Sequence, residues 1–295
     1  MGTYYTPGSD ALTSTPSFEA RRETVIRAPS LARLDMVGNL IKLWQYRDLF
    51  YTLSLHRIRV RYKQTALGIL WAIVQPLAIM LIFTLIFSVI VRMPSEGAAY
   101  PVFAYTALLP WTFFSTALLN GTNSLVNNAQ LITKVSFPRE ILPLTYVVAA
   151  LFDFVIGSSI LVALITYYKV PLTLNYLYVL PIILMLALLA TAASFLLSAM
   201  QVRFRDIGIG MPLLLQVWMF ATPVVYPLSA VPEGLRGLYS LNPVAGIIEN
   251  FRRVVLYGTP PDFFSLGISA AISVLLLIAG YARFKRVEAT MADMI

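Results

Sequence analysis

The chain has 295 residues, 58% of them hydrophobic and only 12% charged. A soluble domain is nearer half apolar and a quarter charged, so this composition predicts a protein that lies in a lipid bilayer. It contains no cysteine and a single histidine, His56, which excludes disulfides, thiol catalysis and cysteine-based metal sites, and we expect no metal in this chain. The net charge of +8 is explained in a membrane protein by topology and by contact with anionic headgroups, so we expect no nucleic-acid partner.

The N-terminal part of the chain divides into a polar tail and an amphipathic helix. Residues 1–34 are rich in Ser, Thr and Pro and have no apolar core, which predicts a flexible cytoplasmic tail rather than a signal peptide. In residues 35–65, polar side chains recur every three or four residues and form one stripe: Lys42, Gln45, Asp48, Thr52, His56 and Arg59. Apolar and aromatic residues cover most of the remainder, which is typical of an interfacial helix that lies flat on the cytoplasmic leaflet. The alternative is a helix packed on a soluble domain.

Six segments are apolar enough and, at about 20 residues or more, long enough to cross a bilayer. They are Ala66–Val91, Phe103–Val126, Ile141–Tyr168, Tyr176–Met200, Ile207–Leu228 and Phe263–Arg283. They predict a six-span transmembrane domain over residues 66–283, followed by a cytoplasmic C-terminal tail at 284–295. Most of the 22 Lys and Arg residues fall in the N-terminal region, in two of the loops and at the C-terminus, so both termini are expected in the cytoplasm. The predicted fold class is an all-α multi-pass membrane protein.

Two connecting segments carry helix signals of their own. In residues 127–138, Asn127 or Asn128 can cap a short helix that Pro138 ends; this helix could be a plug for a partner protein or an ordinary connector. On the external side, Asn242 and Pro243 form a good cap and first-turn pair for a helix that runs to about residue 257. Its apolar content predicts that it re-enters the membrane edge, and a second short helical turn is expected before it, from about residue 232.

Asp153 is the one ionisable residue predicted to lie deep within a span. It falls 12 residues into the third segment, about 18 Å along a helix and therefore near the middle of the membrane. An intramembrane carboxylate is a candidate functional residue, but no basic residue is expected at a similar depth in this chain to complete a proton relay. Asp153 could equally be structural, hydrogen-bonded to a neighbouring helix or to another subunit.

The motifs that would make the chain an enzyme are missing from the sequence. It has no G-x-x-x-x-G-K-[ST] loop to hold ATP, no H-E-x-x-H and no G-x-S-x-G, and its acidic residues are scattered singly. An ion-coupled secondary transporter would need internal repeats and more ionisable groups within the spans, which makes it a weaker alternative. We therefore expect a permease without a nucleotide site of its own.

Several motifs resemble those of one known family. They are RVRYKQTALGILWAIVQP at Arg59–Pro76, SFPREILPL at Ser136–Leu144, RFRDI at Arg203–Ile207, NPV at Asn242–Val244 and FKRVEATMADMI at the C-terminus. Over about residues 24–295, the chain resembles the membrane subunits of type-2 ABC exporters of polysaccharides, most closely the O-antigen branch. The resemblance implies a homodimer in the bacterial inner membrane. It also implies two copies of a separate ATPase subunit, which hold ATP and Mg and drive export of a glycan linked to polyprenyl pyrophosphate.

The resemblance also implies roles for particular residues. The helix at 127–138 would be the coupling helix that sits in a cleft of the ATPase, and the external helices at about 232–257, with Asn242 and Pro243, would form a gate. The residues expected at the ATPase contact are Leu131, Lys134, Phe137, Arg139 and Glu140, the last two fixing the orientation of the helix through ion pairs. An exporter of drugs or lipids with the same architecture is the nearest alternative.

A cluster of cations marks the junction between the amphipathic helix and the first span: Arg57, Arg59, Arg61 and Lys63. Guanidinium groups form forked hydrogen bonds to phosphate oxygens, and the attraction is strong where water is scarce. We interpret the cluster as the site that captures the pyrophosphate of the lipid-linked glycan. The alternative is that these residues only anchor the cytoplasmic end of the span.

A sugar chain needs a path without strong binding points, and aromatic rings offer weak stacking in any register. The candidates are Trp71, Phe103, Tyr105, Trp111, Phe113, Phe114, Trp218, Phe220 and Tyr226. Because aromatic residues at span ends are usually interface anchors, fewer than half of these are expected to line the path.

Overall fold

The computed structural model describes residues 2, 36–63, 65–288 and 291, and in these residues the secondary structure is helical, with no strand. The predicted N-terminal tail, apart from Gly2, and most of residues 289–295 lie outside this part. The α-helices are α1 (Met36–Gln45), α2 (Arg47–Tyr62), α3 (Trp71–Phe83), α4 (Tyr100–Thr122), α5 (Ala129–Lys134), α6 (Ile141–Tyr167), α7 (Val179–Arg203), α8 (Asp206–Phe220), α9 (Glu233–Ser240), α10 (Pro243–Val255) and α11 (Phe263–Glu288). Shorter helical segments are η2 (Gly68–Leu70), η3 (Thr84–Ile90), η4 (Val126–Asn128), η5 (Leu174–Tyr178) and η6 (Leu228–Ala230).

Among the described residues, five helices are long and apolar enough to cross a membrane, which confirms the predicted all-α multi-pass class. They are Gly68–Ile90, Tyr100–Thr122, Ile141–Tyr167, Leu174–Arg203 and Phe263–Glu288. The fifth predicted span differs, because α8 has only 15 residues, about 22 Å against about 30 Å of hydrocarbon. The chain turns after Phe220 since Pro223 has no backbone N–H to continue the helix and disfavours a helical conformation at Thr222.

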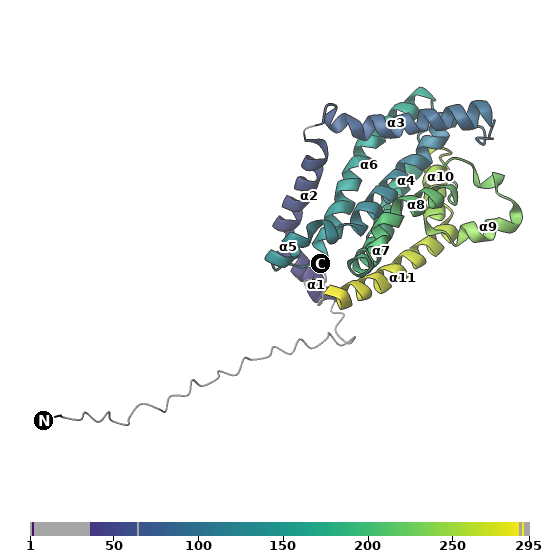
Figure 1. Cartoon of the computed structure of the whole chain (residues 1–295). Helices are drawn as coiled ribbons and strands as arrows, with labels where there is room; N and C mark the ends of the chain where they lie inside the picture. The colour runs from purple at the N-terminus through teal and green to yellow at the C-terminus, as the bar shows by residue number, and fades with distance from the viewer. Residues whose placement is uncertain (1, 3–35, 64, 289–290, 292–295) are drawn as a thin grey trace. The chain divides into compact units, whose positions relative to one another are not determined.

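The core of the helical unit forms around α4. This helix is the most buried of the five candidate spans and packs against both α6 and α7, while α7 also packs along α11 (Figure 1). The approach of α4 to α7 is close at Gly121, where a methyl group would lie only 2.3 Å from the Ser194 hydroxyl. Small residues at such crossings let membrane helices pack tightly.

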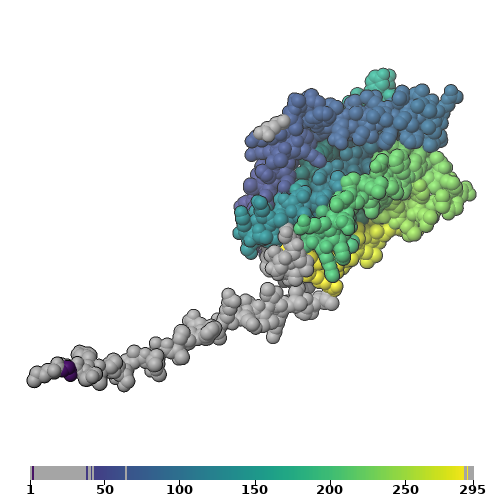
Figure 2. Space-filling view, in the orientation of Figure 1, coloured from purple at the N-terminus to yellow at the C-terminus, as the bar shows by residue number. Residues whose placement is uncertain are grey.

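The first span lies at the edge of the unit. α3 is the least buried candidate span, and in the space-filling view it forms one border of the molecule (Figure 2). It packs on α4 and α6 through only part of its surface. The rest of α3 is apolar and faces outward, as expected for a helix exposed to lipid or to another chain.

The predicted amphipathic helix is two helices, since α1 ends at Gln45 and α2 begins at Arg47. α2 runs beside α6 (Figure 1), and Leu49, Phe50 and Leu53 pack on a cluster at the loop end of the bundle that includes Phe137 and Phe284. The predicted polar stripe is exposed in its described members, but so are Trp44 and Tyr51. α2 therefore rests on the helices of its own chain by a narrow apolar face and leaves both polar and aromatic side chains outward.

The segment before α11, which the sequence predicts to be external, contains the two expected helices, α9 and α10. The predicted cap is confirmed, because the Asn242 side chain accepts a hydrogen bond from the backbone N–H of Val244 at 3.2 Å and Pro243 is the first helical residue. α10 is largely buried against α4, α7 and α11. Its Gly246 lies so close to α11 that a methyl group there would be 2.4 Å from the Ser269 hydroxyl.

Candidate functional site

Asp153 has a basic partner, contrary to the sequence prediction. The guanidinium of Arg61, at the end of α2, forms an ion pair with the Asp153 carboxylate, and the Tyr62 hydroxyl donates a hydrogen bond to the same group. Burial raises the pKa of Tyr62 above its usual range and the hydrogen bond to Asp153 raises it further, so the phenol stays a donor at physiological pH. Arg61 and Tyr62, which are adjacent in α2, thus bind the Asp153 carboxylate, which lies about 18 Å from the start of α6.

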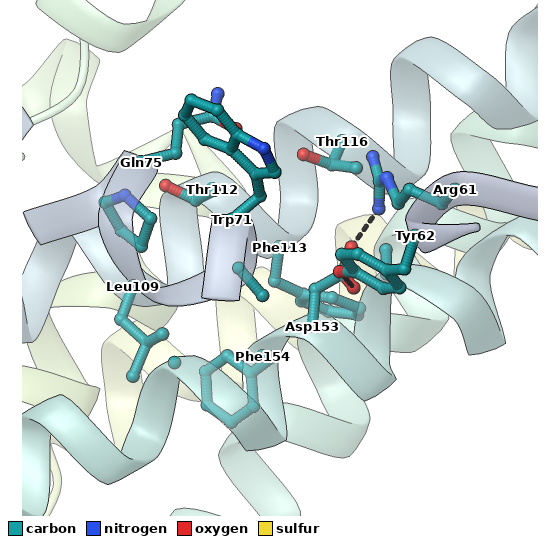
Figure 3. A pocket seen from close by; sticks show the side chains of 14 residues that line it. Arg61, Tyr62, Trp71, Gln75, Leu109, Thr112, Phe113, Thr116, Asp153 and Phe154 are labelled. Atoms are coloured by element: carbon teal, nitrogen blue, oxygen red, sulfur yellow. Dashed lines mark hydrogen bonds and ion pairs between the residues drawn. The ribbon is translucent and has the colours of Figure 1, made fainter. Parts of the chain in front are cut away.

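A cavity of about 240 Å³ opens beside this ion pair. Figure 3 shows Arg61, Tyr62 and Asp153 converging on one side of it. The other walls come from the first turns of α3 and from α4: Trp71, Gln75, Leu109, Thr112, Phe113 and Thr116 are among the lining residues. The cavity therefore combines one ion pair, several uncharged polar groups and aromatic rings.

The four cations of the predicted cluster are not equivalent. Arg57 donates a hydrogen bond to the Asn128 side chain, and its guanidinium lies 4.4 Å from the centre of the Tyr146 ring. Arg61 is paired as described above. Arg59 and Lys63 are exposed and have no side-chain partner among the residues that the structure describes. Two of the four are thus used within the chain and two are available to an anion.

The segment 127–138 contains η4 and α5, as a short helix was predicted there. Lys134 is exposed, Leu131 is partly buried and Phe137 is buried in the cluster at this end of the bundle. A recess of about 390 Å³ is lined by Leu131 and Lys134 together with Asn127, Asn128, Gln130 and Val135. The outward surface of the loop is therefore hollowed and combines polar side chains with the apolar Leu131 and Val135.

Arg139 and Glu140 bind the end of α11. Glu140 is only 1% exposed; it forms an ion pair with Lys285 and accepts a hydrogen bond from the Tyr281 hydroxyl at 3.3 Å. Arg139 donates to the Glu288 carbonyl oxygen, and Lys285 also pairs with Glu288 at 2.8 Å. These contacts fasten the loop after α5 to the last helix of the same chain.

The aromatic candidates lie in two kinds of environment. Five are buried in the core within α4: Phe103, Tyr105, Trp111, Phe113 and Phe114. Trp71 and Phe220 are 46% and 49% exposed, while Trp218 and Tyr226 are partly buried and hydrogen-bonded to the external segment, through Asn242 and Tyr239 respectively. Only Phe113 of the buried group also lines the cavity beside Asp153.

The turn between α8 and α10 is held by polar contacts around Asn242 and Arg252. Asn242 accepts from the Trp218 indole N–H at 3.3 Å and donates to the Thr222 hydroxyl at 3.0 Å. Arg252 is fully buried, lies 4.1 Å from the centre of the Phe103 ring and donates to the carbonyl oxygens of Pro223 and Val224. A buried guanidinium thereby satisfies the carbonyl groups that the turn leaves without helical partners.

A model of the ABC-2 type transporter family matches residues 48–256, which is more than half of the chain. The chain belongs to this family. The match begins in α2 and ends after α10, so it includes the cation cluster, the Asp153 cavity, the loop with α5 and the external helices. The resemblance inferred from the sequence motifs is confirmed.

Curated relatives of this ABC-2 transporter chain have names that refer to polysaccharides. An O-antigen export system permease protein of Myxococcus xanthus is 33% identical over 88% of this chain and 100% of its own length. One of Klebsiella pneumoniae is 27% identical over 84% of this chain and 95% of its own. A polysialic acid transport protein of Escherichia coli is 25% identical over 81% of this chain and 93% of its own.

Sequence reasoning missed several residues that the ABC-2 transporter structure brings to these sites. Tyr62, Gln75 and Thr116 line the cavity, and Lys285 completes the contact with Glu140. Each of these residues lies far along the chain from the residues that it meets in the structure. The one sequence signal that could have identified them is a polar residue inside an apolar run, as at Gln75. In the described part of the chain, no group of three or more His, Cys, Asp or Glu side chains gathers where it could hold a metal ion.

Proposed function

We propose that this chain is the permease subunit of an exporter that moves a lipid-linked polysaccharide out of the cytoplasm across the bacterial inner membrane. The observation that carries the proposal is the similarity, along nearly the whole chain, to proteins named O-antigen export permeases. The multi-pass helical architecture and the absence of a phosphate loop from the sequence support it.

Deletion of the gene tests this function directly. The expected result is a lipid-linked polymer that accumulates on the cytoplasmic leaflet and disappears when the wild-type chain is restored. A normal surface polysaccharide in the deletion strain, with accumulation of a drug or an ordinary lipid instead, would assign the chain to a different substrate class.

Power for transport would come from a separate ATPase subunit, with two copies bound to a homodimer of this chain. We assign the ATPase contact to the surface around α5, because Lys134 is exposed beside a recess that could accept a protruding side chain. Lys134→Glu should weaken co-purification of the ATPase, while Lys169→Glu, the same charge change in a distant loop, should leave it intact. Equal ATPase recovery from both variants would remove α5 from the interface.

The head of the substrate would first bind Arg59 and Lys63. A pyrophosphate is a strong acceptor of charge-assisted hydrogen bonds, and these two cations are exposed and not committed to partners within the described chain. Arg59→Gln with Lys63→Gln should raise the concentration of lipid-linked substrate needed to stimulate ATP hydrolysis. Arg47→Gln, an exposed cation at the opposite end of α2, is the matched control, and an equal effect of both changes would leave only the membrane-anchor role.

The glycan path would use the exposed and partly exposed rings among the candidates. Trp71 lies beside the cavity, and Phe220, Trp218 and Tyr226 lie near the external segment. Of the five candidates buried within α4, only Phe113 reaches the cavity beside Asp153, and the other four are enclosed by the core in this conformation of the single chain. Alanine replacement of Phe220 should therefore lower the rate of glycan export while it leaves the unfolding temperature nearly unchanged.

A further inference from the structure

Three uncharged polar groups that line the cavity beside Asp153 are free to bind a ligand. Neither the Gln75 amide nor the Thr116 hydroxyl nor the Trp71 indole N–H has a hydrogen-bond partner among the residues that the structure describes, and all three residues line this cavity. Trp71 and Gln75 are four residues apart in α3 and share a face of that helix. Polar groups within membrane spans are costly unless they meet water, protein or a polar ligand.

The charge of the cavity excludes an anion as its ligand. Its lining contains one cation, Arg61, and one anion, Asp153, and these two are already paired. A phosphate placed there would meet the Asp153 carboxylate, whereas the unpaired cations, Arg59 and Lys63, are exposed outside the lining set. What the cavity offers is a surface without net charge, made of hydroxyl and amide groups and the paired Asp153 carboxylate beside an aromatic ring.

We propose that this cavity binds one neutral pyranose ring, the sugar attached directly to the pyrophosphate of the transported lipid. The inference rests on the proposed function. Sugar hydroxyls can donate to Asp153 and exchange hydrogen bonds with Gln75 and Thr116, while the C–H face of the ring lies on the exposed indole of Trp71. A volume of about 240 Å³ is below the roughly 300 Å³ at which pockets for drug-sized ligands begin, so it suits one ring rather than a chain.

The position of the cavity agrees with this assignment. Lys63 directly follows Tyr62, a lining residue of the cavity, at the end of α2, so a pyrophosphate bound at Lys63 would bring its first sugar close to the cavity. The hydroxyl-binding groups come from α3, α4 and α6, whereas Arg59 lies in α2 and Lys63 directly follows it. Recognition of the head and recognition of the first sugar would thus depend on different helices, and can be separated by substitution.

Two probes separate the head from the sugar. The full transporter, with its ATPase subunit, is reconstituted in nanodiscs, and binding is measured for a polyprenyl pyrophosphate and for the same lipid bearing one hexose. The wild-type complex should bind the hexose-bearing probe about tenfold more tightly, as expected from two or three additional hydrogen bonds that each contribute modestly. Gln75→Leu with Thr116→Val should remove most of this difference, because only the Asp153 and Trp71 contacts remain, and it should leave the affinity for the bare pyrophosphate unchanged.

Gln216→Leu is the matched control, because Gln216 is an exposed glutamine on α8 that does not line the cavity; it should keep the tenfold preference. A soluble methyl hexoside that weakens binding of the hexose-bearing probe, and not of the bare pyrophosphate, would support the sugar subsite and show that it also accepts free sugars. Equal affinity of the wild-type complex for the two probes would overturn the sugar subsite while leaving the proposed function standing. If neither probe bound, both would be overturned.

Discussion

Replacing Lys285 with methionine should destabilise the protein more than replacing its partner Glu140 with glutamine. Methionine at 285 leaves the Glu140 carboxylate, which is 1% exposed, without a cation and with only the Tyr281 hydroxyl at 3.3 Å. Leaving one charge of a buried pair uncompensated costs about 3–5 kcal/mol. Glutamine at 140 instead leaves Lys285 paired with Glu288 at 2.8 Å and partly exposed, so the expected loss is about 1–2 kcal/mol.

These free energies translate into unfolding temperatures that can be ordered. At roughly 2–4 °C per kcal/mol for a chain of this size, Lys285→Met should lower Tm by about 6–20 °C and Glu140→Gln by about 2–8 °C. The measurement is Tm of the purified protein in one detergent, followed by size-exclusion chromatography after heating. Arg283→Met, an exposed cation on the same helix, is the control and should change Tm little.

The double variant completes the test. With both changes, residue 140 no longer carries a buried charge, and only the partly exposed Glu288 carboxylate loses its contact with Lys285, so Glu140→Gln with Lys285→Met should be more stable than Lys285→Met alone. A Lys285→Met variant that is no less stable than Glu140→Gln would refute the reasoning, because it would mean that the buried carboxylate does not depend on this cation.

Three further changes have outcomes set by single contacts, each measured by Tm in the same detergent unless stated. Asn242→Ala removes the acceptor for Val244 and for the Trp218 indole and should cost about 1–2 kcal/mol, whereas Asn242→Asp keeps the cap; equal losses would contradict the capping role. Gly121→Ala places a methyl 2.3 Å from the Ser194 hydroxyl and should cost about 1–3 kcal/mol, which Ser194→Gly should recover; a failure to recover would place the strain elsewhere. Arg252→Met leaves the carbonyl oxygens at the α8–α10 turn without donors, so amide hydrogen exchange in residues 220–228 should accelerate, and unchanged exchange there would show that the guanidinium does not hold the turn.

Hydropathy was sufficient to place the membrane helices, because burial in lipid demands about 20 consecutive apolar residues whatever the tertiary packing. Local chemistry likewise identified the Asn242 cap, whose donor is only two residues away. The short length of α8 was missed. A run of apolar residues continues through Pro223, and hydropathy alone does not register that proline stops the hydrogen-bonded helix.

The candidate site was only partly predictable. The cations near the first span were found as a cluster in sequence, but the pairing of Arg61 with Asp153 joins residues 92 positions apart, and no local pattern specifies such a contact. The same is true of Arg139 and Glu140, which were expected to orient the loop through ion pairs but whose partners lie on α11. Ion pairs between residues far apart in the sequence depend on how the helices pack, and helix packing cannot be read directly from one sequence.

The last helix, α11, contacts both the loop after α5 and the helix α10. At 26 residues, α11 is a rod about 39 Å long, with the loop after α5 fastened near its C-terminal end through Lys285 and Glu288, and α10 pressed against its N-terminal half where Gly246 meets Ser269. A stiff helix tilts as a lever. A displacement applied to the loop by a neighbouring subunit would therefore shift the external helices without a relay of side-chain changes between them.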